Sequence, residues 1–213
     1  MKEVFSTYFK HKSILLYFFL LSCSAYYLFS TEIIFSYWPV SLVLFSAPFF
    51  EWAVHKYFLH YPFDFKNEKL KKFFYKIHEG HHEYPSDREL IFAPTIVGLS
   101  VPLIFFLIVL GISKNLELSH TAAFFSLAYY CYYEWIHLAH HTDSYTPVTN
   151  RGKKLKRHHT FHHFKNEHYW WGVTTILGDQ IFNTDPTHNK IQKSQTTKNI
   201  FSKTPKDASM MTS

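Results

Sequence analysis

Histidine is the residue whose number and spacing in this chain could support chemistry. Sixteen histidines occur among 213 residues, and eight of them fall between Glu134 and Thr174. Five of the eight have the i, i+3 or i+4 spacing that gathers side chains on one face of a helix: His137, His141, His159, His162 and His163. Because four ligands close a structural zinc site, these histidines exceed what one structural metal needs.

Two earlier segments add histidines of the same kind, EWAVHKYFLH at residues 51–60 and HEGHH at residues 78–82. The complete set is His55, His60, His78, His81, His82, His137, His141, His159, His162 and His163. So many polar rings would be costly to bury beside apolar surface without partners. Ten imidazoles suit two metal ions with about five ligands each, and imidazole is a ligand for iron, zinc or copper.

The other six histidines are not expected to be ligands. His120 lies 17 residues before His137 on the same expected helix, which separates the two by roughly 25 Å. The remaining five either lack partners at helical spacing or merely neighbour an expected ligand: His11, His140, His158, His168 and His188.

Long segments without charge must position these histidines. The uncharged runs are residues 13–31, 33–50, 90–113 and 118–133. At ~1.5 Å per residue, the first three reach or approach the ~30 Å hydrocarbon thickness of a bilayer, and the fourth does so if it extends to Ile136. Buried core helices are the alternative, as is a signal peptide for the first run. The length of the runs and the lack of a small-residue cleavage site favour four transmembrane helices.

The placement of lysine and arginine orients these helices. Basic residues lie before the first run, between the second and third, and after the fourth, whereas the loop between the third and fourth has only Lys114. Lys and Arg favour the cytoplasmic side, so both termini and residues 51–89 should be cytoplasmic. Anionic headgroups then explain the net charge of +6 without a nucleic-acid partner. We expect a multi-pass protein of a bacterial inner membrane or the endoplasmic reticulum.

Two amphipathic helices are expected at the cytoplasmic surface, one from residue 68 to its end before Pro85 and one at residues 152–163. Each combines an HxxHH motif and apolar residues on one face with basic residues on the other, which is typical of a helix lying on a membrane. We therefore predict an all-α integral membrane protein with four transmembrane helices and a cytoplasmic, histidine-rich dimetal site. Residues 1–188 are predicted to form one domain, and the polar tail, residues 189–213, to be disordered.

Four histidine boxes recur in order between Glu51 and Pro186: EWxxHKYxLH, HxxHH before Pro and Asp, EWxHxxxH before Thr, and HxxHHF before GVTxxxxD. With this combination the chain resembles the fatty acid hydroxylase superfamily, which also contains sterol oxidases and desaturases. The resemblance implies that the ten histidines bind two iron ions, for which zinc can substitute in a purified protein. It also implies dioxygen as co-substrate and a membrane lipid as substrate. Asn183 stands where the last motif usually has Gly.

On this resemblance we expect a non-haem diiron monooxygenase that hydroxylates a long-chain acyl lipid at C2. A desaturase or sterol methyl oxidase of the same superfamily is the alternative. A zinc-dependent membrane hydrolase would need fewer ligands, and a metal transporter would place its ligands near the middle of the bilayer. The sequence shows no flavin, haem or iron–sulfur motif, so we expect an external electron-transfer protein, cytochrome b5-like or ferredoxin-like. Oligomeric state is left open.

Two glutamates precede expected ligands on the same helices. Glu51 lies four residues before His55, and Glu134 lies three residues before His137. A carboxylate in such a position could accept the second ring N–H of the ligand and fix its tautomer. A solvated carboxylate at a helix end is the alternative for both.

Overall fold

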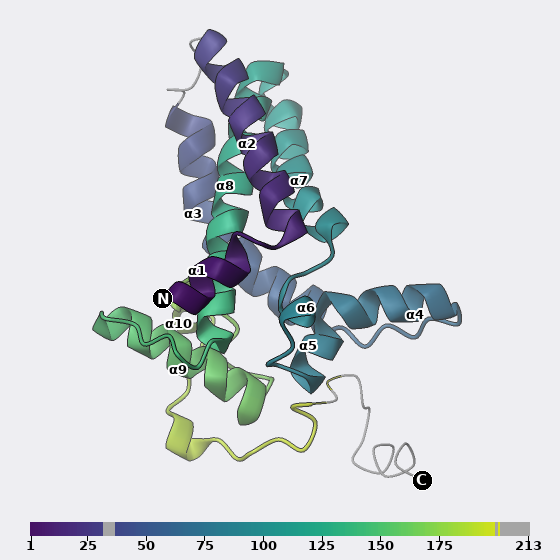
Figure 1. Ribbon diagram of the computed structural model, residues 1–213, viewed down its shortest axis with the longest axis vertical. Coiled ribbons are helices and arrows are strands. Elements are labelled where there is room, and N and C mark those ends of the chain that lie inside the picture. Colours follow the sequence, from purple (N-terminus) through teal and green to yellow (C-terminus); the bar gives the residue numbers. More distant parts are fainter. Residues whose placement is uncertain (32–36, 199, 201–213) are drawn as a thin grey trace. The chain divides into compact units, whose positions relative to one another are not determined.

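The computed structural model describes residues 1–31, 37–198 and 200 (Figure 1). Over these residues the chain is helical and has no strand, which confirms the all-α prediction. The elements are α1 (Lys2–Tyr8), α2 (Lys12–Ser30), α3 (Tyr37–Val54), η1 (His55–Leu59), α4 (Glu68–Phe74), η2 (Tyr75–Glu79), α5 (Gly80–Glu83), α6 (Arg88–Ile91), α7 (Thr95–Ser113), α8 (Leu116–His141), α9 (Asn150–Phe164), α10 (Leu177–Ile181) and η3 (His188–Lys190). Of the three η elements, η1 and η2 are π-helical and η3 is a 3-10 turn.

The chain divides into two compact units, each built from two separate segments. The single domain over residues 1–188 stays a prediction. The helical unit contains Met1–Ala47 and Pro94–Ile136. The histidine unit contains Pro48–Ala93 and the described residues from His137 onward.

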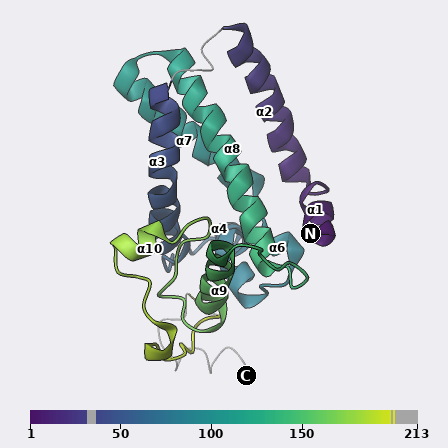
Figure 2. The same ribbon diagram turned by 90° about the vertical axis from the view of Figure 1, so that its left-hand side faces the viewer.

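Helices α2, α7 and α8 run alongside one another in the helical unit (Figure 1, Figure 2). Tyr17 of α2 donates a hydrogen bond to the Thr95 carbonyl at 3.2 Å, and its ring meets the Tyr130 ring edge-on at 5.7 Å. Gly98 permits this approach, because a Cβ there would lie 2.1 Å from the Tyr17 hydroxyl oxygen. The short helix α1, which the sequence did not predict, buries Val4 and Tyr8, four residues apart on one face.

Two stretches among the described residues, Lys12–Ser30 and Arg88–Ser113, are long and apolar enough to cross a membrane. They match the first and third uncharged runs. The second run begins at residues 33–36, outside the described residues, and continues as α3, while the fourth lies within α8. Large apolar side chains are exposed along α2 and α7: Leu15, Leu16, Phe18, Phe19, Ile96, Leu103, Leu107, Ile108 and Ile112. Such exposure is unlike that of core helices in a soluble protein.

In the histidine unit, α4, η2 and α5 follow one another without a break from Glu68 to Glu83. Asn67 caps the start, since its side-chain oxygen accepts from the Lys69 and Leu70 amides at 2.9 and 3.3 Å. Helix α5 ends at Glu83, and Tyr84 follows it directly before Pro85, the residue that the sequence predicted would end the helix. Helix α9 begins after Thr149, whose hydroxyl accepts from the Gly152 amide at 3.0 Å.

The structure describes the start of the predicted tail, and the disorder of residues 189–213 stays a prediction. Among residues 189–198, the Ser194 amide donates to the Lys165 carbonyl at 2.7 Å, and Thr197 is buried. Hydroxyl groups and backbone polar groups of these residues pair with the end of α9 and the following loop. The rest of the predicted tail, residue 199 and residues 201–213, lies outside the described residues.

Candidate metal centre

Ten histidine side chains meet in the histidine unit as two groups of five. In each group, one nitrogen from every ring lies within 4.8 Å of the others. The first histidine group is His55, His60, His78, His82 and His162, and the second histidine group is His81, His137, His141, His159 and His163. All ten are the histidines that the sequence singled out by spacing.

Both HxxHH motifs supply both groups. In η2 and α5, His78 and His82 belong to the first group while His81 belongs to the second. Helix α9 reverses the assignment, because His162 belongs to the first group and the pair four residues apart, His159 and His163, to the second. The groups are neighbours, since the rings of His82 and His163 stack with centroids 4.1 Å apart.

Two π-helical turns set the position of the first group. His55 opens η1 and His60 directly follows it, and a π-helix closes its hydrogen bonds over five residues. The wider turn brings two rings five residues apart to the same side, with centroids 5.2 Å apart. An α-helix, whose neighbouring side chains are three or four residues apart, would not bring residues five apart to one side so closely. His78 lies in the second π-helical turn, η2.

His78 lies at the middle of the first group. Its Nε2 is 3.1 Å from that of His55, 3.0 Å from that of His60 and 3.1 Å from that of His82. Two nitrogens that each lie ~2.1 Å from one metal and at right angles are about 3.0 Å apart, so these separations fit a shared cation. In the second group, the Nε2 atoms of His141 and His159 are 2.7 Å apart.

Backbone carbonyls select the tautomer of three rings in the first group. Trp171 O lies 2.5 Å from His55 Nδ1, Tyr169 O lies 2.8 Å from His162 Nδ1, and Thr197 O lies 3.0 Å from His82 Nδ1. A carbonyl can only accept, so each Nδ1 carries the hydrogen and each Nε2 presents a lone pair to the group. At least three of five converging nitrogens therefore have no hydrogen to offer one another. A bound cation would satisfy them together.

Burial keeps these rings neutral. Desolvation lowers the pKa of His55 to about 4 and that of His82 to about 3. It also holds the pKa of His81 and His163 well below the ordinary range. Both ring nitrogens of His81 and of His163 are buried without a hydrogen-bond partner in the described part of the chain. Neutral, unpartnered imidazoles are what metal ligation requires, so the residues present fit a metal at each group.

Glu51 has different partners from those expected. One of its oxygens accepts from the Val173 and Thr174 amides at 2.5 and 3.0 Å, and the other accepts from the Thr174 hydroxyl at 2.6 Å. His55 Nδ1 instead uses the Trp171 carbonyl. The two oxygens of Glu51 satisfy three donors from Val173 and Thr174, so this carboxylate fixes the loop after α9. An earlier residue of the same loop, Trp171, holds the His55 ring through its carbonyl. Glu134 is buried and accepts from the Tyr130 hydroxyl at 2.5 Å, and its proposed role beside His137 stays a prediction.

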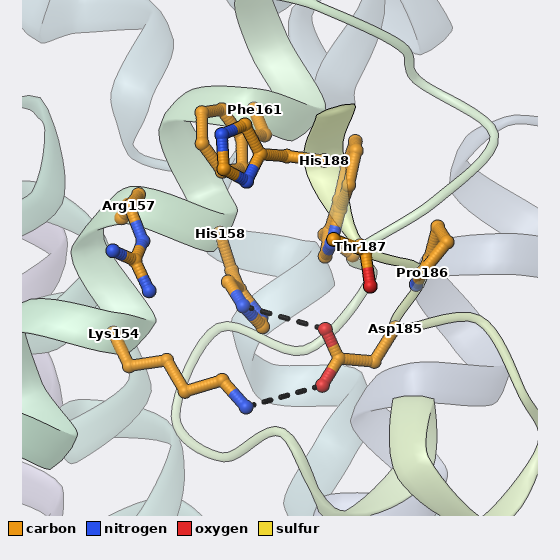
Figure 3. A pocket seen from close by; sticks show the side chains of 9 residues that line it. Lys154, Arg157, His158, Phe161, Asp185, Pro186, Thr187 and His188 are labelled. Atoms are coloured by element: carbon orange, nitrogen blue, oxygen red, sulfur yellow. Dashed lines mark hydrogen bonds and ion pairs between the residues drawn. The ribbon is translucent and has the colours of Figure 1, made fainter. Parts of the chain in front are cut away.

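The six remaining histidines lie outside both groups. His120 hydrogen-bonds with Ser24 at 2.8 Å in the helical unit. His158 lies 3.3 Å from Asp185 in a pocket on the other side of α9, where Lys154 pairs with the same carboxylate at 3.2 Å (Figure 3). His188 stacks on Phe161 at the edge of this pocket. His140 is buried next to His159, and neither His11 nor His168 joins a group.

The loop after α9 contributes residues that the sequence analysis missed. The Trp171 ring lies 4.6 Å from that of His60 and 5.1 Å from that of His162, so it covers one side of the first group. Asp179 accepts from the Trp171 and Gly172 amides at 2.9 and 2.8 Å, which holds this loop. Asp179 ends the GVTxxxxD motif, which was the available signal. Asn183 has a φ of 55°, a left-handed conformation that Gly or Asn adopts readily.

This arrangement defines a helical protein with two adjacent histidine groups able to hold metal ions. A model of the fatty acid hydroxylase family matches residues 40–184. That match covers more than half of the chain, and the chain belongs to this family.

Individual relatives agree with the family match. The chain is 32% identical over 167 residues to a dihydroceramide fatty acyl 2-hydroxylase of Arabidopsis thaliana, covering 73% of this chain and 64% of that protein. It is also 32% identical over 141 residues to a ceramide very long chain fatty acid hydroxylase of Saccharomyces cerevisiae, covering 63% of this chain and 34% of the relative. The chain therefore spans less than two thirds of the length of these relatives.

A solved structure shares the fold. The structure of full-length scs7p, in which only the hydroxylase domain is visible, superposes with a TM-score of 0.67 at 19% identity. The match covers 85% of this chain and 66% of that one.

Proposed function

We propose that this protein is a dioxygen-dependent lipid hydroxylase that acts at C2 of a long-chain acyl lipid, with one iron ion in each histidine group. The observation that supports this most is the convergence of ten neutral histidines into two adjacent groups of five. A structural zinc site takes four ligands and a hydrolytic one usually three, so five nitrogens at each of two metals exceed both needs. The 2-hydroxylases among the relatives favour C2.

The iron ions would supply dioxygen activation, which acid–base side chains cannot provide for an unreactive C–H bond. In the overall reaction, a C–H bond, dioxygen, two electrons and two protons yield a C–OH bond and water. The chain itself holds and shields the centre. Carbonyls of Tyr169, Trp171 and Thr197 orient three ligand rings, and the Trp171 ring excludes water from one side.

A membrane-embedded helical unit with four spans and both termini in the cytoplasm is part of the proposal. The two apolar stretches and the exposed side chains of α2 and α7 support it. With the ligands at the cytoplasmic ends of the spans, an acyl lipid whose headgroup stays at the interface would present its first carbons to the site. This depth favours C2 over carbons far along the chain.

In this proposal the electrons come from another protein, because no flavin, haem or iron–sulfur motif is visible in the sequence. The outer side of α9 offers a basic surface, with Lys154, Arg157 and His188 around the pocket that contains Asp185 (Figure 3). An acidic one-electron carrier of the cytochrome b5 or ferredoxin type would be attracted to this surface.

Expression in a host whose lipids lack 2-hydroxy acyl chains tests the function. We expect 2-hydroxy acyl lipids with the natural chain and none with His78→Ala or His159→Ala, each of which removes one ligand from one group. Elemental analysis of the purified natural protein should give two metals per chain. A new double bond without a hydroxyl would favour a desaturase, and oxidised sterols with unchanged acyl lipids would reject the acyl substrate.

A further inference from the structure

Residues 188–198 form a segment that we call the C-terminal strap, and it is fastened to the end of α9 by several hydrogen bonds. Lys165 donates from its side chain to the His188 carbonyl at 2.5 Å, and Asn166 donates to the Gln192 carbonyl at 3.2 Å. The Ser194 amide donates in return to the Lys165 carbonyl at 2.7 Å. Figure 1 shows the strap, in yellow, running below α9 towards α5.

A buried carboxylate anchors the middle of the strap. Glu167 is 1% exposed, and its Oε1 accepts from the Ser194 hydroxyl at 2.9 Å and from the Thr196 hydroxyl. The two hydroxyls also lie within hydrogen-bonding distance of each other, at 2.9 Å. A buried carboxylate without such donors would be costly, so the anchor and the strap depend on each other.

The strap ends on a ring of the first histidine group. Thr197 is buried, and its carbonyl accepts from Nδ1 of His82 at 3.0 Å. His55 and His162 of the same group are held in the same way by carbonyls of the loop after α9, those of Trp171 and Tyr169. Thr197 thus hydrogen-bonds to a ring of the first group, while His163 of the second group lines a cavity of about 440 Å³ together with residues of the strap.

We infer that the strap, anchored by Glu167, is a positioning element that selectively stabilises the metal of the first histidine group. The inference rests on the proposed function. Through its carbonyl, Thr197 keeps the hydrogen of His82 on Nδ1 and turns Nε2 inward. Glu167 acts indirectly, because it holds Ser194 and Thr196 and thereby the backbone that carries the Thr197 carbonyl. The second group does not share this dependence, so the two metals differ in their sensitivity to the strap.

Metal content of the full-length protein after dialysis against a graded chelator tests the inference. Loss of a partner that orients a ligand typically costs about 10- to 100-fold in metal affinity. Glu167→Ala should therefore retain one metal at chelator concentrations where the natural chain retains two. Glu167→Gln should restore the second, because its amide oxygen can accept from the same two hydroxyls. The paired change Ser194→Ala with Thr196→Val should behave like Glu167→Ala, and Glu68→Ala, at an exposed carboxylate, like the natural chain.

Ligand variants show which metal is lost. In a His141→Ala background, where the second group is weakened, Glu167→Ala should remove the metal that remains. In a His60→Ala background it should change nothing further. Equal chelator sensitivity of Glu167→Ala and the natural chain would overturn the inference, as would equal loss in both backgrounds. A natural chain that binds no metal would instead overturn the proposed function, and this inference with it.

Discussion

Individual ring nitrogens explain why ten histidines divide into two groups. The i, i+3, i+4 spacing predicted which rings share a helix face, and all ten expected residues converge. Spacing did not predict that each HxxHH motif would split between the groups, since that depends on what lies on either side of the helix. The carbonyls that fix His55 and His82 lie 116 and 115 residues away in sequence, and the one that fixes His162 lies seven residues away. Sequence spacing contains no signal for such partners.

Acid should destabilise the histidine unit and release its metals. Burial lowers the pKa of His55 to about 4 and of His82 to about 3, below the ordinary value of 6.5. At a pH between the folded pKa of each ring and 6.5, the unfolded chain binds a proton at that ring and the folded chain does not. The free energy of unfolding therefore falls as pH falls from 6.5. Above 6.5 these rings add no pH dependence. Two measurements at neutral and mildly acidic pH check this expectation. One is the metal content of the untreated protein, and the other is the thermal midpoint of unfolding of chelator-treated protein. A thermal midpoint of the chelator-treated protein that does not fall between pH 6.5 and about 4 would contradict the burial of neutral histidines.

Substitution of Glu51 should separate its structural role from ligand contact. Glu51→Gln retains an acceptor for the Val173 and Thr174 amides and should cost under about 1 kcal/mol in unfolding free energy. Glu51→Ala leaves three buried donors without acceptors and should cost about 3 kcal/mol or more, with weaker metal binding because the loop before Val173 supports His55. Denaturant unfolding of both variants and of the natural protein measures these losses of unfolding free energy. Equal stability of Glu51→Ala and the natural protein would show that this carboxylate does not hold the loop.

At the scale of elements, α9 presents two functional faces. Its inner face supplies three histidines to the two groups, and its outer face bears Lys154, Arg157 and His158 around Asp185. The amphipathic pattern predicted this helix and the α4–α5 segment. It did not predict the π-helical turns η1 and η2, which no local propensity favours. They are instead explained by the convergence of His60 and His78 on the first group, a tertiary effect.

Charge reversal on the outer face of α9 should weaken delivery of electrons. With a soluble cytochrome b5 or ferredoxin as donor, Arg157→Glu should raise the KM for the donor severalfold at low ionic strength, and added salt should diminish the difference. Activity with a small chemical reductant should be unchanged, because Arg157 lies outside both histidine groups.

Lys72→Glu provides the matched control, since Lys72 is an exposed lysine of the other basic helix, α4. An equal rise in KM for both variants would indicate a general effect of charge and reject the outer face of α9 as the docking surface.

For the whole molecule, the uncharged runs and the amphipathic segments predicted an all-helical chain, while the orientation inferred from charge placement stays a prediction. The end of the α4–α5 segment agreed with its local signal, since α5 ends at Glu83, shortly before Pro85. The packing of α1 and the contacts of residues 189–198 could not be predicted, because both depend on partners distant in sequence: Cys131 for Tyr8 and His82 for Thr197.

Cysteine labelling of sealed cells tests the proposed topology. In a background with Cys23 replaced by Ser, Asn115→Cys lies between α7 and α8, and Lys66→Cys precedes α4. A membrane-impermeant maleimide added outside should label position 115 and not position 66, because basic segments favour the cytoplasm. Labelling in the opposite pattern would place the histidine unit outside and reject the orientation.

The origin of the inserted oxygen tests the central claim most directly. A host expressing the natural chain is grown under ¹⁸O-labelled dioxygen, and its acyl lipids are examined by mass spectrometry. A host expressing His78→Ala with His159→Ala provides the background. We expect 2-hydroxy acyl chains that carry one ¹⁸O atom in the host that expresses the natural chain, and none in the host that expresses the double variant. Hydroxyl groups without label, or acyl lipids identical in the two hosts, would contradict it.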